Sequence, residues 1–346
     1  MNKFLLIPGL FILSLILSCN NPGKNVIQGN DQPVKNQPIK VIFDTDLGND
    51  IDDVLALQMV LNYHKQGKIN LLGITLSKAN PLAVKFVDGY CNFNNLPEVP
   101  IGYVYDGVNP EEGTYLRQTL ETKVDGHNIL VPKLTSHDSI PEAFLLIREL
   151  LSSQIDSSVV IIAVGPQTNL ARLLGSGPDN FSPMTGTELV ENKVKLLSVM
   201  GGLYVEQYDF AEWNILQDLA SAKKVFKEWP TRIIASGFEV GNALLYPHQS
   251  IEEDFSNPGK HPLCVAYNEW GDMPYDRPTW DLTSVLVAIE AEKSFFQYSP
   301  NGKIEILDDG KSRFEASEHG VHQYLIHESI KTEEVLNALR NIVAWK

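Results

Sequence analysis

Five aspartates stand between an apolar strand and a helix near the start of the chain, in the segment VIFDTDLGNDIDDVLAL at residues 41–57. Asp44, Asp46, Asp50, Asp52 and Asp53 fall within ten positions, and no lysine or arginine interrupts them. Carboxylates at this density repel one another by about 1–4 kcal/mol per close pair. A fold accommodates them when a hard cation or a proton lies among them. Because open α/β sheets bind ligands beyond the carboxyl ends of their strands, the segment predicts a site at such a sheet edge.

Helix capping accounts for only some of these aspartates. Asp52 and Asp53 can cap free N–H groups at a helix start and suit the positive end of the helix dipole. Asp50 can equally be a turn residue. Asp46 follows the strand directly and has no such explanation, whereas a metal site explains the whole cluster.

The chain after the first 38 residues alternates strand-like and helix-like segments. Strands are predicted at residues 39–44, 69–76, 158–164, 195–200 and 231–236, and helices at 52–65, 82–93, 141–153, 168–174, 218–229, 283–290 and 332–344. The helix at 52–65 is predicted to be amphipathic. Repeated strand–helix units predict an α/β fold with a doubly wound, mostly parallel open sheet in a single domain. The segment 106–138 is expected to be loop-like, and both this segment and 250–277, which is rich in Pro, Gly and aromatic residues, are candidates to cover the site.

The N-terminus is typical of a targeting segment. A positive start at Lys3 precedes an apolar stretch at residues 4–17, shorter than the roughly 20 residues of a transmembrane helix. The stretch ends in Leu17-Ser18-Cys19, which resembles the lipobox of bacterial lipoproteins and implies a signal peptide over 1–18 with lipid attached to Cys19. A plain signal peptide is the alternative. Residues 19–38 are expected to be a flexible tether, residues 39–346 the folded domain, and the protein a lipid-anchored component of the bacterial cell envelope, on the periplasmic side or at the outer membrane.

Charge and cysteine content restrict the partners. The formal net charge of −15 opposes binding to nucleic acid, because little remains to neutralise phosphates. Besides Cys19 there are only Cys91 and Cys264. They could form a single disulfide, but two cysteines make no disulfide framework, and we expect both to be small buried apolar side chains.

Four further polar segments follow predicted strands or stand late in the chain. They are ITLSKAN at 74–80, VGPQTNLA at 164–171, MGG at 200–202 with EWNI at 212–215, and RPTWD at 277–281. If the strands are parallel, all of these segments meet the aspartates at one edge of the sheet.

Together these motifs resemble the inosine-uridine-preferring nucleoside hydrolase family. The first resembles that family's DTDxGxDD signature, GPQTNLA resembles its GPLTNLA segment, MGG with EWNI resembles MGG…E[FW]N[IV], and Trp280-Asp281 stands where the family has a His-Asp pair. The motifs keep the family's order from about Val41 to Ala288. The resemblance implies the Rossmann-like fold of these hydrolases and cleavage of the N-glycosidic bond of a ribonucleoside, with membrane contact only through the lipid anchor. We also expect a homo-oligomer, a dimer or a tetramer.

The resemblance also implies a role for each matching residue. Asp46 would bind Ca²⁺ and act as the general base toward a metal-bound water. Asp53, Asp281 and the main-chain carbonyl of Thr168 would complete the protein ligands, and all-oxygen ligation suits Ca²⁺. The ribose hydroxyls would be held by Asp52, Asn80, Glu212 and Asn214.

Three departures from the family pattern bear on the substrate. Two extra residues in the signature make Asp50 and Asp52 alternatives for sugar binding, and we favour Asp52 because it belongs to the pair that abuts the helix. Trp280 replaces the usual histidine, a proposed acid for the leaving base. Some purine-preferring members have tryptophan there and sandwich the base between aromatic rings, which favours purine nucleosides here. The asparagine expected six residues before Glu212 is instead Glu206.

Simpler roles and two other functions stay open. Thr168, Asn80 and Asp281 could be helix caps, and Glu212 could be a surface residue. Asp44-Thr45-Asp46 fits superficially the nucleophile and acid of a haloacid-dehalogenase-type phosphatase, but Gly48 stands where such enzymes usually have Thr or Val. A lipid-anchored protein that binds nucleosides without cleaving them is the other alternative.

Overall fold

The computed structural model describes Met1, residues 37–134 and residues 139–345. The predicted signal peptide, Cys19 and most of the predicted tether lie outside these residues, so lipid anchoring and envelope localisation stay predictions. Residues Gln37–Lys346 form one compact unit. Within the described ranges, no helix combines the length and the apolar character needed to cross a bilayer.

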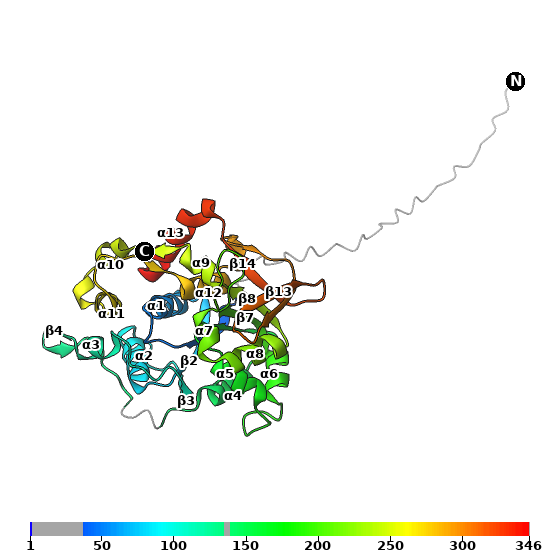
Figure 1. The fold of residues 1–346 in the computed structure, drawn as a ribbon, viewed down its shortest axis with the longest axis horizontal. Helices are drawn as coiled ribbons and strands as arrows, with labels where there is room; N and C mark the ends of the chain where they lie inside the picture. Colours follow the sequence, from blue (N-terminus) through cyan, green and yellow to red (C-terminus); the bar gives the residue numbers. More distant parts are fainter. Residues whose placement is uncertain (2–36, 135–138, 346) are drawn as a thin grey trace. The chain divides into compact units, whose positions relative to one another are not determined.

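A ten-stranded, mostly parallel sheet forms the centre of this unit (Figure 1). Its order is β13-β12-β14-β8-β7-β6-β1-β2-β3, and β11 pairs with β14. The strands are β1 (Ile39–Thr45), β2 (Ile69–Lys78), β3 (Ile101–Val108), β6 (Val159–Ala163), β7 (Val194–Met200), β8 (Arg232–Ser236), β11 (Gln297–Tyr298), β12 (Gly302–Ile306), β13 (Ser312–Ala316) and β14 (His322–Ile326). From β1 the chain proceeds outward to β2 and β3, then returns to the other side of β1 for β6, β7 and β8. The switch in direction lies between β1 and β6, where open sheets bind ligands.

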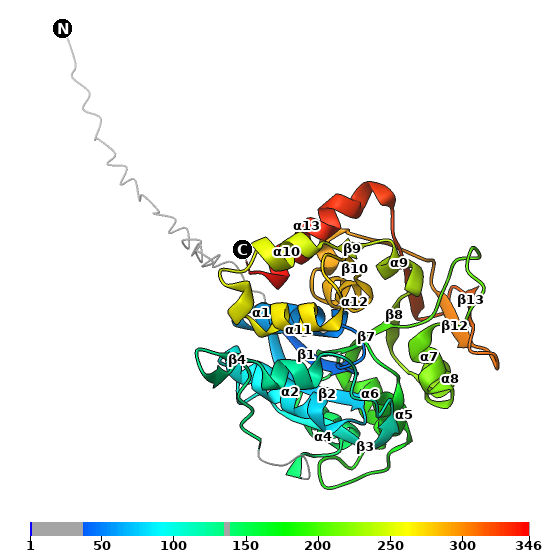
Figure 2. The ribbon, with the colours of Figure 1, turned by 60° about the vertical axis from the view of Figure 1, so that its left-hand side comes forward.

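Helices cover both faces of the sheet. The helices are α1 (Asp52–Lys65), α2 (Pro81–Phe93), α3 (Leu116–Glu121), α4 (Ala143–Ser152), α5 (Thr168–Gly175), α6 (Gly186–Lys193), α7 (Trp213–Gln217), α8 (Leu219–Glu228), α9 (Phe238–Asn242), α10 (His248–Glu253), α11 (Pro262–Trp270), α12 (Trp280–Ile289) and α13 (Thr332–Val343). Figure 2 shows α1, α11 and α12 together on one side of the sheet and α4, α5 and α6 on the other. Successive residues of β1 divide accordingly, since Val41 and Phe43 enter the core with α1 whereas Ile42 enters the core with α4 and α5. The predicted doubly wound α/β fold is therefore confirmed.

Several expectations about single elements are wrong. Helix α1 is buried along Asp52–Tyr63 rather than amphipathic, because α11, α12 and α13 pack around it. The segment 106–138, expected to be loop-like, begins with the end of β3 and contains α3. The segment 250–277, for which no element was predicted, contains most of α10 and all of α11. Two small sheets, β4 (Lys123–Val124) with β5 (His127–Asn128) and β9 (Leu245–Tyr246) with β10 (Arg277–Pro278), were also not predicted.

The antiparallel edge of the sheet, β12 to β14, has no counterpart in the predicted strands. β12 alternates buried Ile304 and Ile306 with exposed Lys303 and Glu305. This period-two pattern is the sequence signal that could have predicted it. The two described cysteines, Cys91 and Cys264, are free and buried, as predicted.

Candidate active site

The turn from β1 to α1 carries the aspartate cluster to the carboxyl edge of the sheet. Gly48 has a φ of +131°, a conformation that side chains disfavour, and a Cβ there would lie 2.8 Å from the Leu116 side chain. The phenol of Tyr115 donates a hydrogen bond of 2.9 Å to the carbonyl of Asp50 and fixes the far side of the turn. Gly48 and Tyr115 therefore both shape the turn that carries Asp50 toward α1.

Three carboxylates converge at the start of two packed helices. Asp52 and Asp53 open α1 and Asp281 lies in the first turn of α12, and their oxygens lie within 4.8 Å of one another. The backbone N–H of Asp281 donates to Asp52 at 3.1 Å, and the Thr45 hydroxyl donates to Asp53. All three side chains are buried, and none forms an ion pair with a residue in the described part of the chain. This all-oxygen, charged donor set fits a hard divalent cation such as Ca²⁺.

Asp46 lies beside this group and is positioned by its neighbours. The Asn49 amide donates to Asp46 Oδ2 at 3.0 Å, and Lys78 Nζ donates to Asn49 Oδ1 at 2.5 Å. On the opposite side, a Cβ on Gly165 would lie 2.6 Å from Asp46 Oδ1, so only glycine leaves room for the carboxylate. The GPQTNLA motif thus contributes its glycine to the shape of the aspartate site.

Burial raises the pKa of Asp46 and of the three converging carboxyl groups. It raises the pKa of Asp46 to about 6, and it raises the pKa values of Asp52, Asp53 and Asp281 well above their usual range. Mutual repulsion adds to the effect of burial, because Asp53 faces the charge of Asp46 and Asp281 faces that of Asp52. A cation bound among them favours the ionised carboxylates and reverses these shifts.

A cavity of about 370 Å³ opens above the carboxylates, within the range of small-molecule sites. Its walls combine carboxylates, amides, aromatic rings and one guanidinium. The lining residues are Asp46, Asn49, Asp50, Asp52, Asp53, Val164, Met200, Glu212, Trp213, Asn214, Phe238, Arg277, Trp280 and Asp281.

Glu212 and Asn214 form a second polar wall of the cavity. Glu212 caps α7 and accepts hydrogen bonds from the backbone N–H groups of Asn214 at 2.8 Å, Ile215 at 3.2 Å and Gly202 at 3.3 Å. Burial nevertheless raises the pKa of Glu212 to about 7. The Asn214 amide nitrogen donates to the carbonyl of Val164 at 2.9 Å, while its Oδ1 receives no hydrogen bond from a described residue. An acceptor is thus available to a ligand at this wall.

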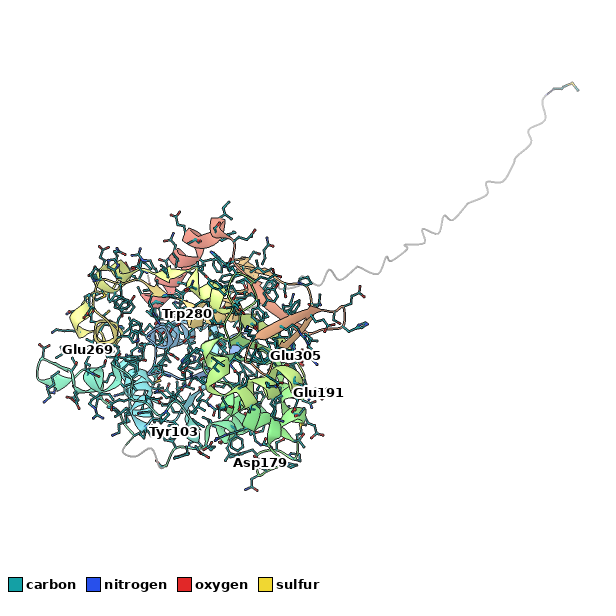
Figure 3. All side chains as sticks on the ribbon, viewed as in Figure 1. Tyr103, Asp179, Glu191, Glu269, Trp280 and Glu305 are labelled. Atoms are coloured by element: carbon teal, nitrogen blue, oxygen red, sulfur yellow. The ribbon has the colours of Figure 1, made fainter. Side chains whose placement is uncertain are left out.

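Trp280 and Phe238 form the aromatic wall. Trp280, labelled in Figure 3, stacks on Phe238 with ring centroids 5.4 Å apart, and its Nε1 donates to the Phe238 carbonyl at 2.9 Å. Two predicted site residues do not line the cavity. Asn80 caps α2 through Leu82 N–H at 2.9 Å and donates to the carbonyl of Pro110 at 2.8 Å. The Thr168 hydroxyl donates to Asp218 at 2.7 Å at the start of α5.

Arg277 is a residue of the site to which the sequence gave no role, and its partner Asp50 was the alternative to Asp52 for sugar binding. Arg277 forms an ion pair with Asp50, and the Nε to Oδ1 distance is 2.8 Å. Asp52, by contrast, joins the converging carboxylates. Asn49 is also new to the site. The sequence signal that could have identified Arg277 is its position in RPTWD, where it is the one basic residue. The other charged residues of the site are acidic.

The family model described as inosine-uridine preferring nucleoside hydrolase matches residues 41–331. The chain belongs to this family. The match covers every segment that forms the cavity, from the end of β1 to α12. A comparison with curated proteins gives no match.

Solved nucleoside hydrolases share the fold. The plant nucleoside hydrolase PpNRh1 aligns with a TM-score of 0.66 at 18% identity, over 89% of this chain and 100% of that one. An inosine-guanosine nucleoside hydrolase aligns with a TM-score of 0.66 at 16% identity, over 88% and 98%. The inosine-uridine preferring nucleoside hydrolase of Bacillus anthracis aligns with a TM-score of 0.59 at 17% identity, over 88% and 99%. At these identities the likeness concerns the fold.

Proposed function

We propose that this nucleoside hydrolase family member cleaves the N-glycosidic bond of ribonucleosides, with a preference for purines, and releases the free base and ribose. The observation that carries the proposal is the convergence of Asp52, Asp53 and Asp281 beside Asp46 at a cavity of nucleoside size. Family membership supports the same reaction.

Three of the four buried carboxylates are the proposed calcium ligands. Asp46, Asp53 and Asp281 would hold the ion together with the Thr168 carbonyl, as the family pattern implies. When bound, calcium lowers the pKa of a coordinated water and offers coordination to two ribose hydroxyls. Asp52 lies in the same carboxylate group and is the proposed partner of a ribose hydroxyl.

The chain's own residues supply the remaining chemistry. Asp46 accepts the proton of the attacking water, and Asn49 holds its carboxylate in place. Asp52, Glu212 and Asn214 hold the ribose hydroxyls and so place C1′ before that water. As the bond to the base breaks, positive charge develops on the sugar, and the surrounding carboxylates stabilise it. Asn80 is less suited to sugar binding here, since both polar atoms of its side chain are bonded within the protein.

Incubation of the protein with inosine and calcium tests this function. Release of hypoxanthine and ribose in repeated turnovers supports hydrolysis. A stoichiometric complex with unchanged inosine would instead support a nucleoside-binding protein, and release of phosphate from a phosphomonoester would support a phosphatase.

Trp280 is proposed to stack on the leaving base. Trp280→Ala is expected to raise the activation free energy for kcat/KM by about 1–3 kcal/mol, the usual value for a base stacked on an aromatic ring. The loss should be larger for inosine than for uridine, because a purine covers more of the indole. Measurement of kcat/KM for both substrates, together with the melting temperature, checks this expectation.

Trp280→Phe provides the matched control, since it keeps an aromatic face and should recover part of the activity. If Trp280 only packs on Phe238, its removal leaves a cavity that lowers stability by roughly 3–5 kcal/mol. An equal loss for inosine and uridine with a large fall in melting temperature would then rule out base stacking.

A further inference from the structure

Arg277 is the one basic side chain among the described residues that line the cavity. Its guanidinium lies 4.2 Å from the ring centroid of Trp270 and 5.0 Å from that of Trp280. The side chain is about 20% exposed, and its partner Asp50 about 27%. Neither residue has a part in the metal and sugar chemistry proposed above.

Asp50 occupies only one edge of this guanidinium. Arg277 Nε donates to Asp50 Oδ1 at 2.8 Å, and Nη2 donates to Asp50 Oδ2. Nη1 donates to no residue in the described part of the chain, and Nη2 retains a second N–H. The edge formed by Nη1 and Nη2 therefore remains available for another planar pair of acceptors.

The surroundings of Arg277 determine which acceptors this edge suits. Asp50 neutralises the guanidinium, and the cavity carries further carboxylates at Asp46, Asp52 and Glu212. A phosphate would meet repulsion here, whereas a neutral planar ring would not. The rings of Trp270 and Trp280 and the ion pair restrict the guanidinium to one orientation.

A purine base presents such acceptors along one edge. In 6-oxopurines the adjacent atoms N7 and O6 both accept hydrogen bonds, and arginine binds this pair in a bidentate manner. In adenine the corresponding pair is an acceptor at N7 and a donor at N6. An arginine edge that only donates therefore distinguishes the two classes of purine.

We propose that Arg277 binds the N7–O6 edge of the leaving base through Nη1 and Nη2, and so selects 6-oxopurine nucleosides such as inosine and guanosine over adenosine. This inference rests on the proposed nucleoside site. Asp50 acts through Arg277 and is a positioning residue.

The same contact assists bond cleavage. The water oxygen forms a bond to C1′, the C1′–N9 bond breaks, and its electron pair passes to the base, which later takes a proton from solvent. Negative charge that spreads to N7 and O6 strengthens the hydrogen bonds from Arg277. Trp280 stands where the family has its usual histidine, and Arg277 would support the leaving group without transferring a proton.

Arg277→Lys tests the proposal, because lysine keeps the charge and can still reach Asp50 but lacks the planar edge. Binding of inosine and adenosine is measured by competition in calcium-loaded protein with native Asp46, because Asp46 is a proposed calcium ligand, and kcat/KM is measured in the same protein. The ratio of inosine to adenosine should fall by about 10- to 100-fold in both measurements. The wild-type protein should also bind 7-deazainosine, which lacks the N7 acceptor, about tenfold more weakly than inosine.

Arg340→Lys is the matched control. Arg340 also binds a carboxylate through Nε and Nη2, both 2.9 Å from Asp254, but neither residue lines the cavity. This variant should leave the nucleoside ratio unchanged. If Arg277→Lys does not fold, the comparison of inosine, adenosine and 7-deazainosine in the wild-type protein still decides.

The outcomes separate this inference from the proposed function. Equal binding and cleavage of inosine and adenosine, or an unchanged ratio in Arg277→Lys, would overturn the role of Arg277 while hydrolysis stands. Selective binding of inosine without turnover would support Arg277 but defeat hydrolysis. Absence of binding of either nucleoside at millimolar concentration would defeat both.

Discussion

Asp46→Asn is expected to lower kcat for inosine by about 10²–10⁴-fold, the usual contribution of a positioned general base. The amide has nearly the same shape as the carboxylate but cannot accept the proton of the attacking water. Folding should survive, because the substitution removes one of several buried carboxylates that repel one another. Steady-state kinetics and the melting temperature of the purified variant check both expectations.

Asp88→Asn is the control for this substitution. Asp88 is also buried, but it accepts hydrogen bonds from the backbone N–H groups of Lys133 and Leu134 and does not line the cavity. Its kcat should stay close to that of the wild-type protein. If Asp46→Asn retained a near-normal kcat, the general base would have to be another residue.

Removal of calcium is expected to abolish turnover and to lower the melting temperature in a pH-dependent manner. Elemental analysis of dialysed protein should give one calcium per chain. At a free concentration 100 times its Kd, a ligand that binds only the folded state adds about 2.7 kcal/mol of stability. A metal-free preparation with full activity would contradict the proposed site.

The sign of the pH dependence follows from the raised carboxyl pKa values. In the metal-free protein the folded state holds protons on Asp46, Asp52, Asp53 and Asp281 more tightly than the unfolded chain does. Their contribution to stability is fully present below about pH 4. This contribution is lost as the pH rises through the folded-state pKa of each group, which is about 6 for Asp46. The loss is about 1.4 kcal/mol per pH unit for each proton that is released.

Calcium should therefore raise the melting temperature more at pH 7.5 than at pH 5, because protons compete with the ion for the carboxylates. Thermal melts with calcium and with a chelator at both pH values measure the difference. Magnesium provides the control ion, since it prefers a smaller, strictly octahedral site. An equal calcium effect at both pH values would show that these carboxylates do not bind the ion.

Local patterns were sufficient for the central elements of the fold. The strands that flank the switch point, β1, β2, β6 and β7, are apolar runs with clear ends, and each was predicted from the sequence. The edge hairpin β12–β13 was missed because its strands are half exposed and carry few apolar residues, only Phe314 and Ala316 in β13. Helix α1 was expected to be amphipathic, but α11, α12 and α13 pack around it and bury it. The sequence of residues 52–65 alone does not indicate that these three helices pack there.

The sequence by itself determined that a group of carboxylates able to hold a cation would form where β1 meets α1, because all of its aspartates except Asp281 are neighbours in the chain. Only the tertiary structure decided which partner each aspartate contacts. The turn at Gly48 and the distant Arg277 direct Asp50 away from the group that Asp52 joins. The packing of α1 against α12 adds Asp281 to that group. Side-chain direction depends on turn conformation and on partners more than 200 residues away, which spacing along the chain does not encode.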